Sequence, residues 1–185
     1  SHNTYAEGEA NNKCIDCDSG HTSPEGAGGC GQCGAGEYAD VGTCKKCAAG
    51  KYSKVGSAIC VDCHAGSYSA SDGTETCTEC AAGKYQGSAS QTSCTSCSPG
   101  SFSMQGAASC TTCLRGTIAP GSGAASCAGC PEGSATLSTG QTSCTQCTTN
   151  TYAKGDGNVI CMPCASGYVS VANAGTCTLC KAGTY

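Results

Sequence analysis

The stretch Cys47-Ala-Ala-Gly-Lys-Tyr-Ser-Lys-Val-Gly-Ser-Ala-Ile-Cys60-Val-Asp-Cys63 holds three cysteines and two glycines in seventeen residues. Its last two cysteines form a Cys-x-x-Cys pair, and eleven such pairs occur along the chain. They begin at Cys14, Cys30, Cys44, Cys60, Cys77, Cys94, Cys110, Cys127, Cys144, Cys161 and Cys177. Successive pairs begin 14 to 17 residues apart. One short unit therefore repeats from Cys14 onward, and this repeat decides the fold.

Other residue types keep the same register. Three residues after the second cysteine of each pair stands a glycine, replaced once by Asn150. Asn is, after Gly, the residue that best tolerates a left-handed backbone, so this position is predicted to have positive φ. Two residues further on, seven units have Tyr or Phe, and a turn residue stands four residues before the next pair. Each unit is therefore predicted to be a small hairpin without helical periodicity.

The composition leaves little material for an ordinary hydrophobic core. The 185 residues include no Trp, one Phe and two Met, but 22 Cys and 28 Gly. This cysteine content exceeds the level of about 8–10% that marks a disulfide scaffold. A chain so poor in large apolar side chains cannot offset its conformational entropy by burial alone, so bridges or metals are required.

Three interpretations of the cysteine pairs compete. Structural zinc would use the pairs two at a time, but eleven pairs leave one over and their spacing is too regular for alternating fingers and linkers. A redox site would need a helix N-terminus beside the pair, and the sequence predicts no helix. Disulfides fit better, because a cysteine followed by x-x-Gly-x-aromatic can close a hairpin on the cysteine eleven to fourteen positions later.

The disulfide interpretation predicts ten bridges. They are Cys17–Cys30, Cys33–Cys44, Cys47–Cys60, Cys63–Cys77, Cys80–Cys94, Cys97–Cys110, Cys113–Cys127, Cys130–Cys144, Cys147–Cys161 and Cys164–Cys177. Cys14 and Cys180 are left over and are expected to pair outside this window. A competing arrangement, in which each pair crosses to the next one, would instead join Cys14 to Cys30.

The run from Cys47 to Cys63 resembles the ephrin-receptor-like cysteine-rich repeat, also called GCC2/GCC3. It is similar as well to the cysteine-rich modules of tumour-necrosis-factor receptors and to EGF-like modules. The resemblance covers nearly everything from Cys14 onward, and departs from the motif where Thr22, Ile118, Ala135 and Val169 replace the aromatic residue. It implies an extracellular, disulfide-linked, elongated array with the same bridges. Long arrays of this kind resemble surface proteins of protists and algae, including coat antigens and flagellar-hair components.

The predicted fold class is small and disulfide-rich: an elongated rod of tandem hairpin repeats with little regular secondary structure and no helix. Residues 1–13 are assigned to an N-terminal lead-in. Residues 14–185 are assigned to the tandem repeats, which we expect to continue beyond both ends.

No catalytic, cofactor-binding or metal-binding residues are predicted, and no cofactor is expected. His2, His21 and His64 are scattered and have no nucleophile or acid at a catalytic spacing. Nine basic residues against thirteen acidic ones, without a basic run, argue against nucleic acid as a partner. No apolar stretch is long enough to span a membrane.

These features together predict a non-enzymatic, secreted structural protein of the extracellular space or cell surface, serving in a coat, stalk or filament. The expected partners are other extracellular proteins or copies of the chain itself, and the Ser and Thr residues of the hairpin tips are candidate sites for O-glycans. The alternative is a receptor-like ectodomain that binds a protein or glycan ligand, with the docking site between Cys113 and Cys144, where the aromatic residues are missing.

Overall fold

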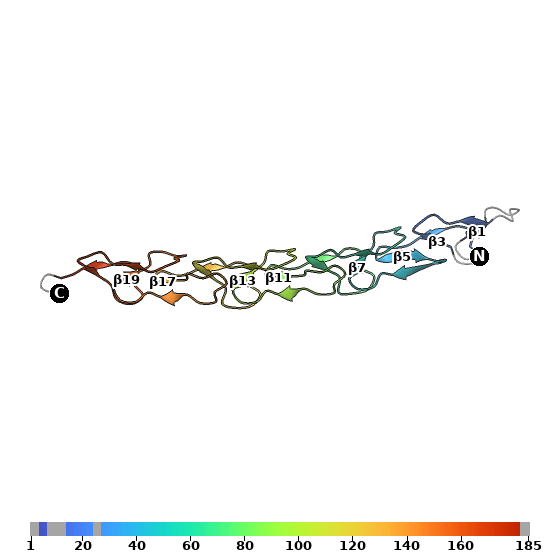
Figure 1. The fold of residues 1–185 in the computed structure, drawn as a ribbon. Helices are drawn as coiled ribbons and strands as arrows, with labels where there is room; N and C mark the ends of the chain where they lie inside the picture. Colours follow the sequence, from blue (N-terminus) through green and yellow to red (C-terminus); the bar gives the residue numbers. More distant parts are fainter. Residues whose placement is uncertain (1–3, 7–13, 24–26, 182–185) are drawn as a thin grey trace. The chain divides into compact units, whose positions relative to one another are not determined.

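The computed structural model describes residues 4–6, 14–23 and 27–181. Within these ranges every regular element is a β-strand, and none is a helix. Each strand pairs antiparallel with a single neighbour in sequence, which gives eleven separate two-stranded hairpins (Figure 1). The predicted class, a small disulfide-rich fold of tandem hairpins, is confirmed.

The chain divides into two compact units. The first comprises Ser1–Cys80, Gln86–Cys94 and Gly106–Ala108, and the second comprises Ala81–Tyr85, Thr95–Gln105 and Ser109–Tyr185. The strand pairs of the first unit are β1 (Thr4–Ala6) with β2 (Cys14–Asp16), β3 (His21–Thr22) with β4 (Gly31–Gln32), β5 (Glu37–Asp40) with β6 (Thr43–Lys46), β7 (Lys51–Tyr52) with β8 (Val61–Asp62), and β9 (Ser67–Tyr68) with β10 (Thr78–Glu79).

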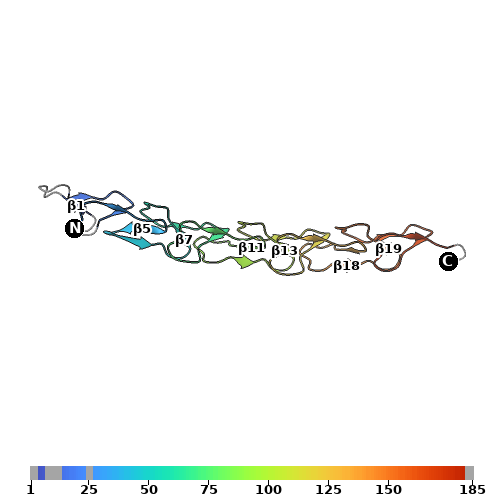
Figure 2. The ribbon, with the colours of Figure 1, turned by 180° about the vertical axis from the view of Figure 1, so that it is seen from behind.

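The second unit continues the same pattern, and its hairpins follow one another in chain order in both views (Figures 1 and 2). Its strand pairs are β11 (Lys84–Tyr85) with β12 (Thr95–Ser96), β13 (Ser101–Phe102) with β14 (Thr111–Thr112), β15 (Thr117–Ile118) with β16 (Ala128–Gly129), β17 (Ser134–Ala135) with β18 (Thr145–Gln146), β19 (Thr151–Tyr152) with β20 (Met162–Pro163), and β21 (Tyr168–Val169) with β22 (Thr178–Leu179).

All hairpins share one register. The residue after the glycine and the aromatic residue pair with the two residues between the next cysteines, as in Lys51↔Asp62 and Tyr52↔Val61. The first hairpin has the same register, with Thr4↔Asp16 and Tyr5↔Ile15. Residues 4–6 of the stretch assigned to the lead-in therefore pair with residues 14–16 of the repeats.

The short unit between Cys33 and Cys44 is built differently. Its strands β5 and β6 each have four residues and pair as far as Asp40↔Thr43. Val41 and Gly42 form the tip, with φ angles of 25° and 77°. Positive φ at both central residues is the signature of the tight turn that matches the twist of a hairpin. Because this unit is shorter in sequence than the others, its strands are joined by a compact turn in place of an open loop.

From Gly20 to Gly167, the glycine three residues after each second cysteine has the positive φ that the sequence predicts. Gly50 has φ of 85°, and Asn150, the exception to glycine, has φ of 61°. Space is a second requirement, because a Cβ built on Gly100 would lie 2.1 Å from the carbonyl oxygen of Gly140. Gly140 belongs to the hairpin after the next one. Glycine is therefore needed both for its backbone angle and for this close approach.

The core consists of sulfur and small side chains. The second cysteine of each pair from Cys33 to Cys147 is at most 2% exposed, and Ser53 and Ser103 are buried beside this row. Large apolar side chains such as Met104 and Leu114 are instead mostly exposed. The described ranges contain no helix able to cross a bilayer.

Gly100→Ala is expected to destabilise the protein by more than Gly167→Ala does. Gly167 also has positive φ, at 83°, but no atom of the described residues lies within 4 Å of where its Cβ would be. Gly167→Ala should therefore lower the free energy of unfolding by only about 1–2 kcal/mol, the cost of a left-handed backbone at alanine. Gly100→Ala should lower it further, because its Cβ would also clash with the backbone of Gly140. Denaturant unfolding of the two oxidised variants measures the difference, and equal costs would contradict the close packing at Gly140.

Candidate functional site

Ten disulfides close the hairpins, and each of them joins two cysteines that the sequence pairs. They run from Cys17–Cys30, in the β3–β4 hairpin, to Cys164–Cys177, in the β21–β22 hairpin, with partners 11 to 14 positions apart in the sequence and Cα–Cα distances of 5.5 to 5.8 Å. Because Cys30 is bonded to Cys17, the competing Cys14–Cys30 pairing does not occur. Cys180 has no disulfide partner and is half-buried. The side chain of Cys14 lies outside the described part of the structure.

A backbone hydrogen bond closes each hairpin beside its disulfide. The N–H of Cys63 donates to the carbonyl oxygen of Gly50 at 2.9 Å. The same bond recurs at every unit from Cys33, which donates to Gly20, to Cys180, which donates to Gly167. The glycine of each unit is thus fixed at the base of its own hairpin.

Neighbouring hairpins are joined through the glycine and through the residue after the aromatic position. The N–H of Gly50 donates to the carbonyl oxygen of Ser69 in the next hairpin at 2.9 Å. In the opposite direction, the buried hydroxyl of Ser53 donates to the carbonyl oxygen of Glu37 at 2.8 Å, and that of Ser103 donates to Lys84 at 2.9 Å. The sequence analysis missed these serines. The recurrence of Ser, Thr or Ala six residues after the second cysteine was the available signal.

The turn of a hairpin packs on the preceding hairpin. The N–H of Gly123 donates to the carbonyl oxygen of Cys97 at 2.8 Å, and the N–H of Gly106 does the same to Cys80. In the longer units the turn is thus fixed by a neighbouring hairpin as well as by its own strands. Since buried backbone groups must be paired, these bonds set the spacing of consecutive hairpins within each unit of the fold.

Charged pairs gather in the first unit. Lys45 bonds Asp40, Lys51 bonds Asp62, and the Lys54 ammonium lies 3.7 Å from the Glu75 carboxylate. The hydrogen bond from Lys51, with a second one from Ser90, lowers the pKa of Asp62. The hydrogen bond to Asp40 raises the pKa of Lys45. All these groups are solvent-exposed, so the pairs add little to stability.

Three grooves occupy the same place in the repeat, between one hairpin and the base of the next. We name them the Tyr38, Ile118 and Tyr152 grooves after the side chain at the aromatic position, and their volumes are about 350, 350 and 530 Å³. We call the first cysteine of a bridge the opening cysteine of its hairpin and the second the closing cysteine. The next hairpin contributes three residues to each groove: the residue after its opening cysteine, the residue after its glycine, and its closing cysteine. These are Ala48, Lys51 and Cys60; Pro131, Ser134 and Cys144; and Ala165, Tyr168 and Cys177.

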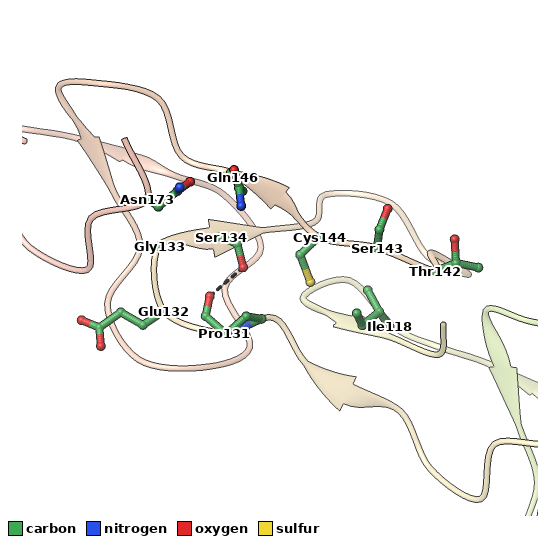
Figure 3. A pocket seen from close by; sticks show the side chains of 10 residues that line it. All are labelled: Ile118, Pro131, Glu132, Gly133, Ser134, Thr142, Ser143, Cys144, Gln146 and Asn173. Atoms are coloured by element: carbon green, nitrogen blue, oxygen red, sulfur yellow. Dashed lines mark hydrogen bonds between the residues drawn. The ribbon is translucent and has the colours of Figure 1, made fainter. Parts of the chain in front are cut away.

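The grooves share a frame but differ in chemistry. The Ile118 groove is lined by the hydroxyl side chains of Thr142 and Ser143 and by Ser134, whose hydroxyl donates to the Pro131 carbonyl oxygen at 2.7 Å (Figure 3). The Tyr38 groove carries two lysines, and the Tyr152 groove carries a second tyrosine, Tyr168. The backbone of the grooves is therefore the same, while the chemistry of the side chains that line them differs from groove to groove.

The described residues contain no cluster of three or more His, Cys, Asp or Glu side chains that could hold a metal ion. His21 and His64 approach only nearby backbone: the His21 Nδ1 lies 3.4 Å from the Ser19 carbonyl oxygen, and the His64 Nδ1 lies 2.7 Å from that of Ala65. His2 lies outside the described residues. Neither described histidine is placed to act on a nucleophile.

A protein family described as tyrosine-protein kinase ephrin type A/B receptor-like matches three stretches, residues 50–80, 66–103 and 100–143. The stretches overlap and together cover just over half of the chain. The chain belongs to the ephrin-receptor-like family. No curated protein matches it. Ephrin-receptor-like repeats are a non-catalytic, disulfide-rich type of module, and such disulfide density is typical of extracellular proteins.

Replacing one bridge by the double variant Cys113→Ala, Cys127→Ala is expected to lower the free energy of unfolding of that hairpin by about 3 kcal/mol, from the loop closed by the bridge. The measurement is amide hydrogen exchange at β15 and β16. Cys180→Ala is the matched control, because Cys180 forms no disulfide. Unchanged protection in the double variant would show that the hairpin is held without its bridge.

The carboxyl group of Asp62 is expected to titrate below its ordinary pKa of 3.8, because Lys51 stabilises its charged form. A lowered pKa in the folded state means that this ion pair contributes above the unfolded value and is lost as the pH falls through the folded value. Carbon NMR of the side-chain carboxyl measures the midpoint. Lys51→Gln should raise that midpoint, whereas Lys54→Gln, which leaves the Lys51–Asp62 pair intact, should not.

Proposed function

We propose that this chain is a non-enzymatic structural protein, secreted or held at the cell surface, whose hairpins form a stiff spacer in an extracellular coat, stalk or filament. The observation that supports this role is the repetition of the same closure and stacking contacts in both units of the fold. An array whose units contact only near neighbours gains length without needing a larger core.

The physical basis of the stiffness is local. In the β11–β12 hairpin, for example, the Cys80–Cys94 bridge closes the loop, the Gly83 N–H bonds the next hairpin at Ser103, and the Ser90 N–H of its turn bonds the preceding hairpin at Cys63. Opening one unit would require breaking these bonds while the disulfide still restricts the loop. Ten disulfides also persist only in an oxidising environment, which supports a location outside the cell.

The second candidate is a receptor-like ectodomain that binds a protein or glycan. The Ile118 groove favours this role because most of its lining residues fall between Cys113 and Cys144, where the sequence departs from the aromatic motif. Its lining of hydroxyl and amide side chains offers hydrogen-bond donors and acceptors.

Small-angle X-ray scattering of the oxidised chain tests the spacer. A compact particle of 185 residues would have a radius of gyration of about 16 Å. If each hairpin advances the rod by the length of about five extended residues, or about 15 Å, about ten hairpins would reach on the order of 150 Å. A rod of that length has a radius of gyration of about 40 Å. We expect the larger value together with a linear cross-sectional Guinier region.

The reduced and alkylated chain is the control, because a random coil of this length has a radius of gyration of about 46 Å and resembles the rod in that quantity alone. The coil lacks the constant cross-section. A radius near 16 Å for the oxidised chain, or a coil-like profile, would refute the spacer.

A further inference from the structure

The Tyr38 groove combines an apolar wall with positive charge, unlike the Ile118 groove of the same build. Its lining includes Tyr38, Ala58 and Ile59, and Ile59 is 68% exposed. Lys46 and Lys51 line the same groove. Both are among four lysines, Lys45, Lys46, Lys51 and Lys54, that fall within ten residues of a chain whose net charge is −4.

Within the part of the chain that the structure describes, three of these lysines have carboxylate partners and the fourth does not. Lys45, Lys51 and Lys54 pair with Asp40, Asp62 and Glu75. Lys46 forms no ion pair with any residue that the structure describes. Lys46 is therefore the cation of this cluster that remains open to a ligand.

Lys46 also has an unusual identity for its place in the repeat. It stands directly before the second cysteine of a pair, where no other unit has Lys or Arg. The residues at that place elsewhere are Asp16, Gln32, Asp62, Glu79, Ser96, Thr112, Gly129, Gln146, Pro163 and Leu179.

Packing positions the Lys46 side chain. A Cβ built on Gly73 would lie 3.3 Å from the Lys46 Cδ and 3.7 Å from its Cε, so the aliphatic stem lies against the turn of a later hairpin. A lysine whose stem is packed keeps its ammonium group at the surface. Less side-chain entropy is then lost when that ammonium binds an anion.

Neighbouring carboxylates leave this charge available. Asp62 is already bonded by Lys51 and Ser90. Glu37 stands opposite Lys46 in the β5–β6 register, yet no ion pair joins them. The negative charge of Glu37 therefore does not occupy Lys46, but it would repel a bound carboxylate.

We propose that the Tyr38 groove binds a peptide segment in which a carboxylate side chain stands beside an aromatic or aliphatic one. The carboxylate bonds the Lys46 ammonium, and the apolar side chain covers Tyr38 and Ile59. Charge complementarity selects this occupant, because the groove offers an unpaired cation next to apolar surface. The inference deepens the receptor-like candidate, but places the site in the first unit rather than between Cys113 and Cys144.

The test uses the ¹⁵N-labelled, fully oxidised chain and two probes, 3-phenylpropionate and its neutral isostere 3-phenylpropionamide. We expect saturable amide shifts at Tyr38, Lys46 and Ile59 with the carboxylate, and binding weaker by about three-fold or more with the amide. Added salt should reduce this preference, because exposed charges are screened. Equal binding of the two probes, or no saturable shift, would overturn the proposal.

Variants separate the charge from the fold. Lys46→Gln should abolish the preference for the carboxylate, and it introduces the side chain that Gln32 already places at the same position of another unit. Glu37→Gln should strengthen carboxylate binding by removing a negative charge that stands opposite Lys46 and repels the ligand. Lys84→Gln, a lysine of the second unit at the place equivalent to Lys51, should change neither. A preference that persists in Lys46→Gln would overturn the proposal.

The Ile118 groove supplies an internal control, since it has the same frame without a lysine and should not shift with the carboxylate. Matching shifts there would also overturn the proposal. Scattering tests the spacer and NMR tests this site, so the two proposals can fail separately. An elongated chain that does not bind the carboxylate would refute only the binding site. A compact chain that does bind it would refute only the spacer.

Discussion

The fold depends on the covalent closure of each hairpin at its base. Strands of two residues bury almost no apolar surface and would not persist by themselves. The disulfide removes the loop entropy that such a strand pair cannot offset, and its opening cysteine is at most 2% exposed in the units from Cys33 to Cys147. One residue thus supplies both the covalent restraint and the core. This economy explains how the chain folds with one Phe and no Trp.

Closure at the base then fixes how hairpins approach one another. The glycine beside the bridge bonds the next hairpin through its N–H, and its missing Cβ admits a turn from the hairpin after that. These contacts use backbone atoms and the small Ser and Ala side chains, so they constrain few residue types. The side chains that line the grooves are left free to vary, as the lysines, hydroxyls and tyrosines of the three grooves show.

Backbone stacking with variable grooves also connects the two candidate roles. A spacer requires identical contacts between units, whereas a receptor requires surfaces that differ from unit to unit. The repeat meets both needs because its contacts and its variable side chains occupy different positions. The ephrin-receptor-like family assignment agrees with this division, since it identifies the module type and leaves the ligand open.

The sequence by itself determined the hairpin repeat, the disulfide partners and the positive φ of Gly50 and Asn150, because each depends on residue types at short, regular separations. The docking site that the sequence suggests between Cys113 and Cys144 stays a prediction, because the Ile118 groove in that region is one of three grooves of the same build. Only the tertiary structure showed that Tyr38 and Ile59 line one groove, that Lys46 has no carboxylate partner among the described residues, and that a Cβ on Gly100 would meet the carbonyl of Gly140. These facts depend on the spacing and rotation between consecutive hairpins. Backbone hydrogen bonds set both, so the pattern of side chains in the sequence does not predict them.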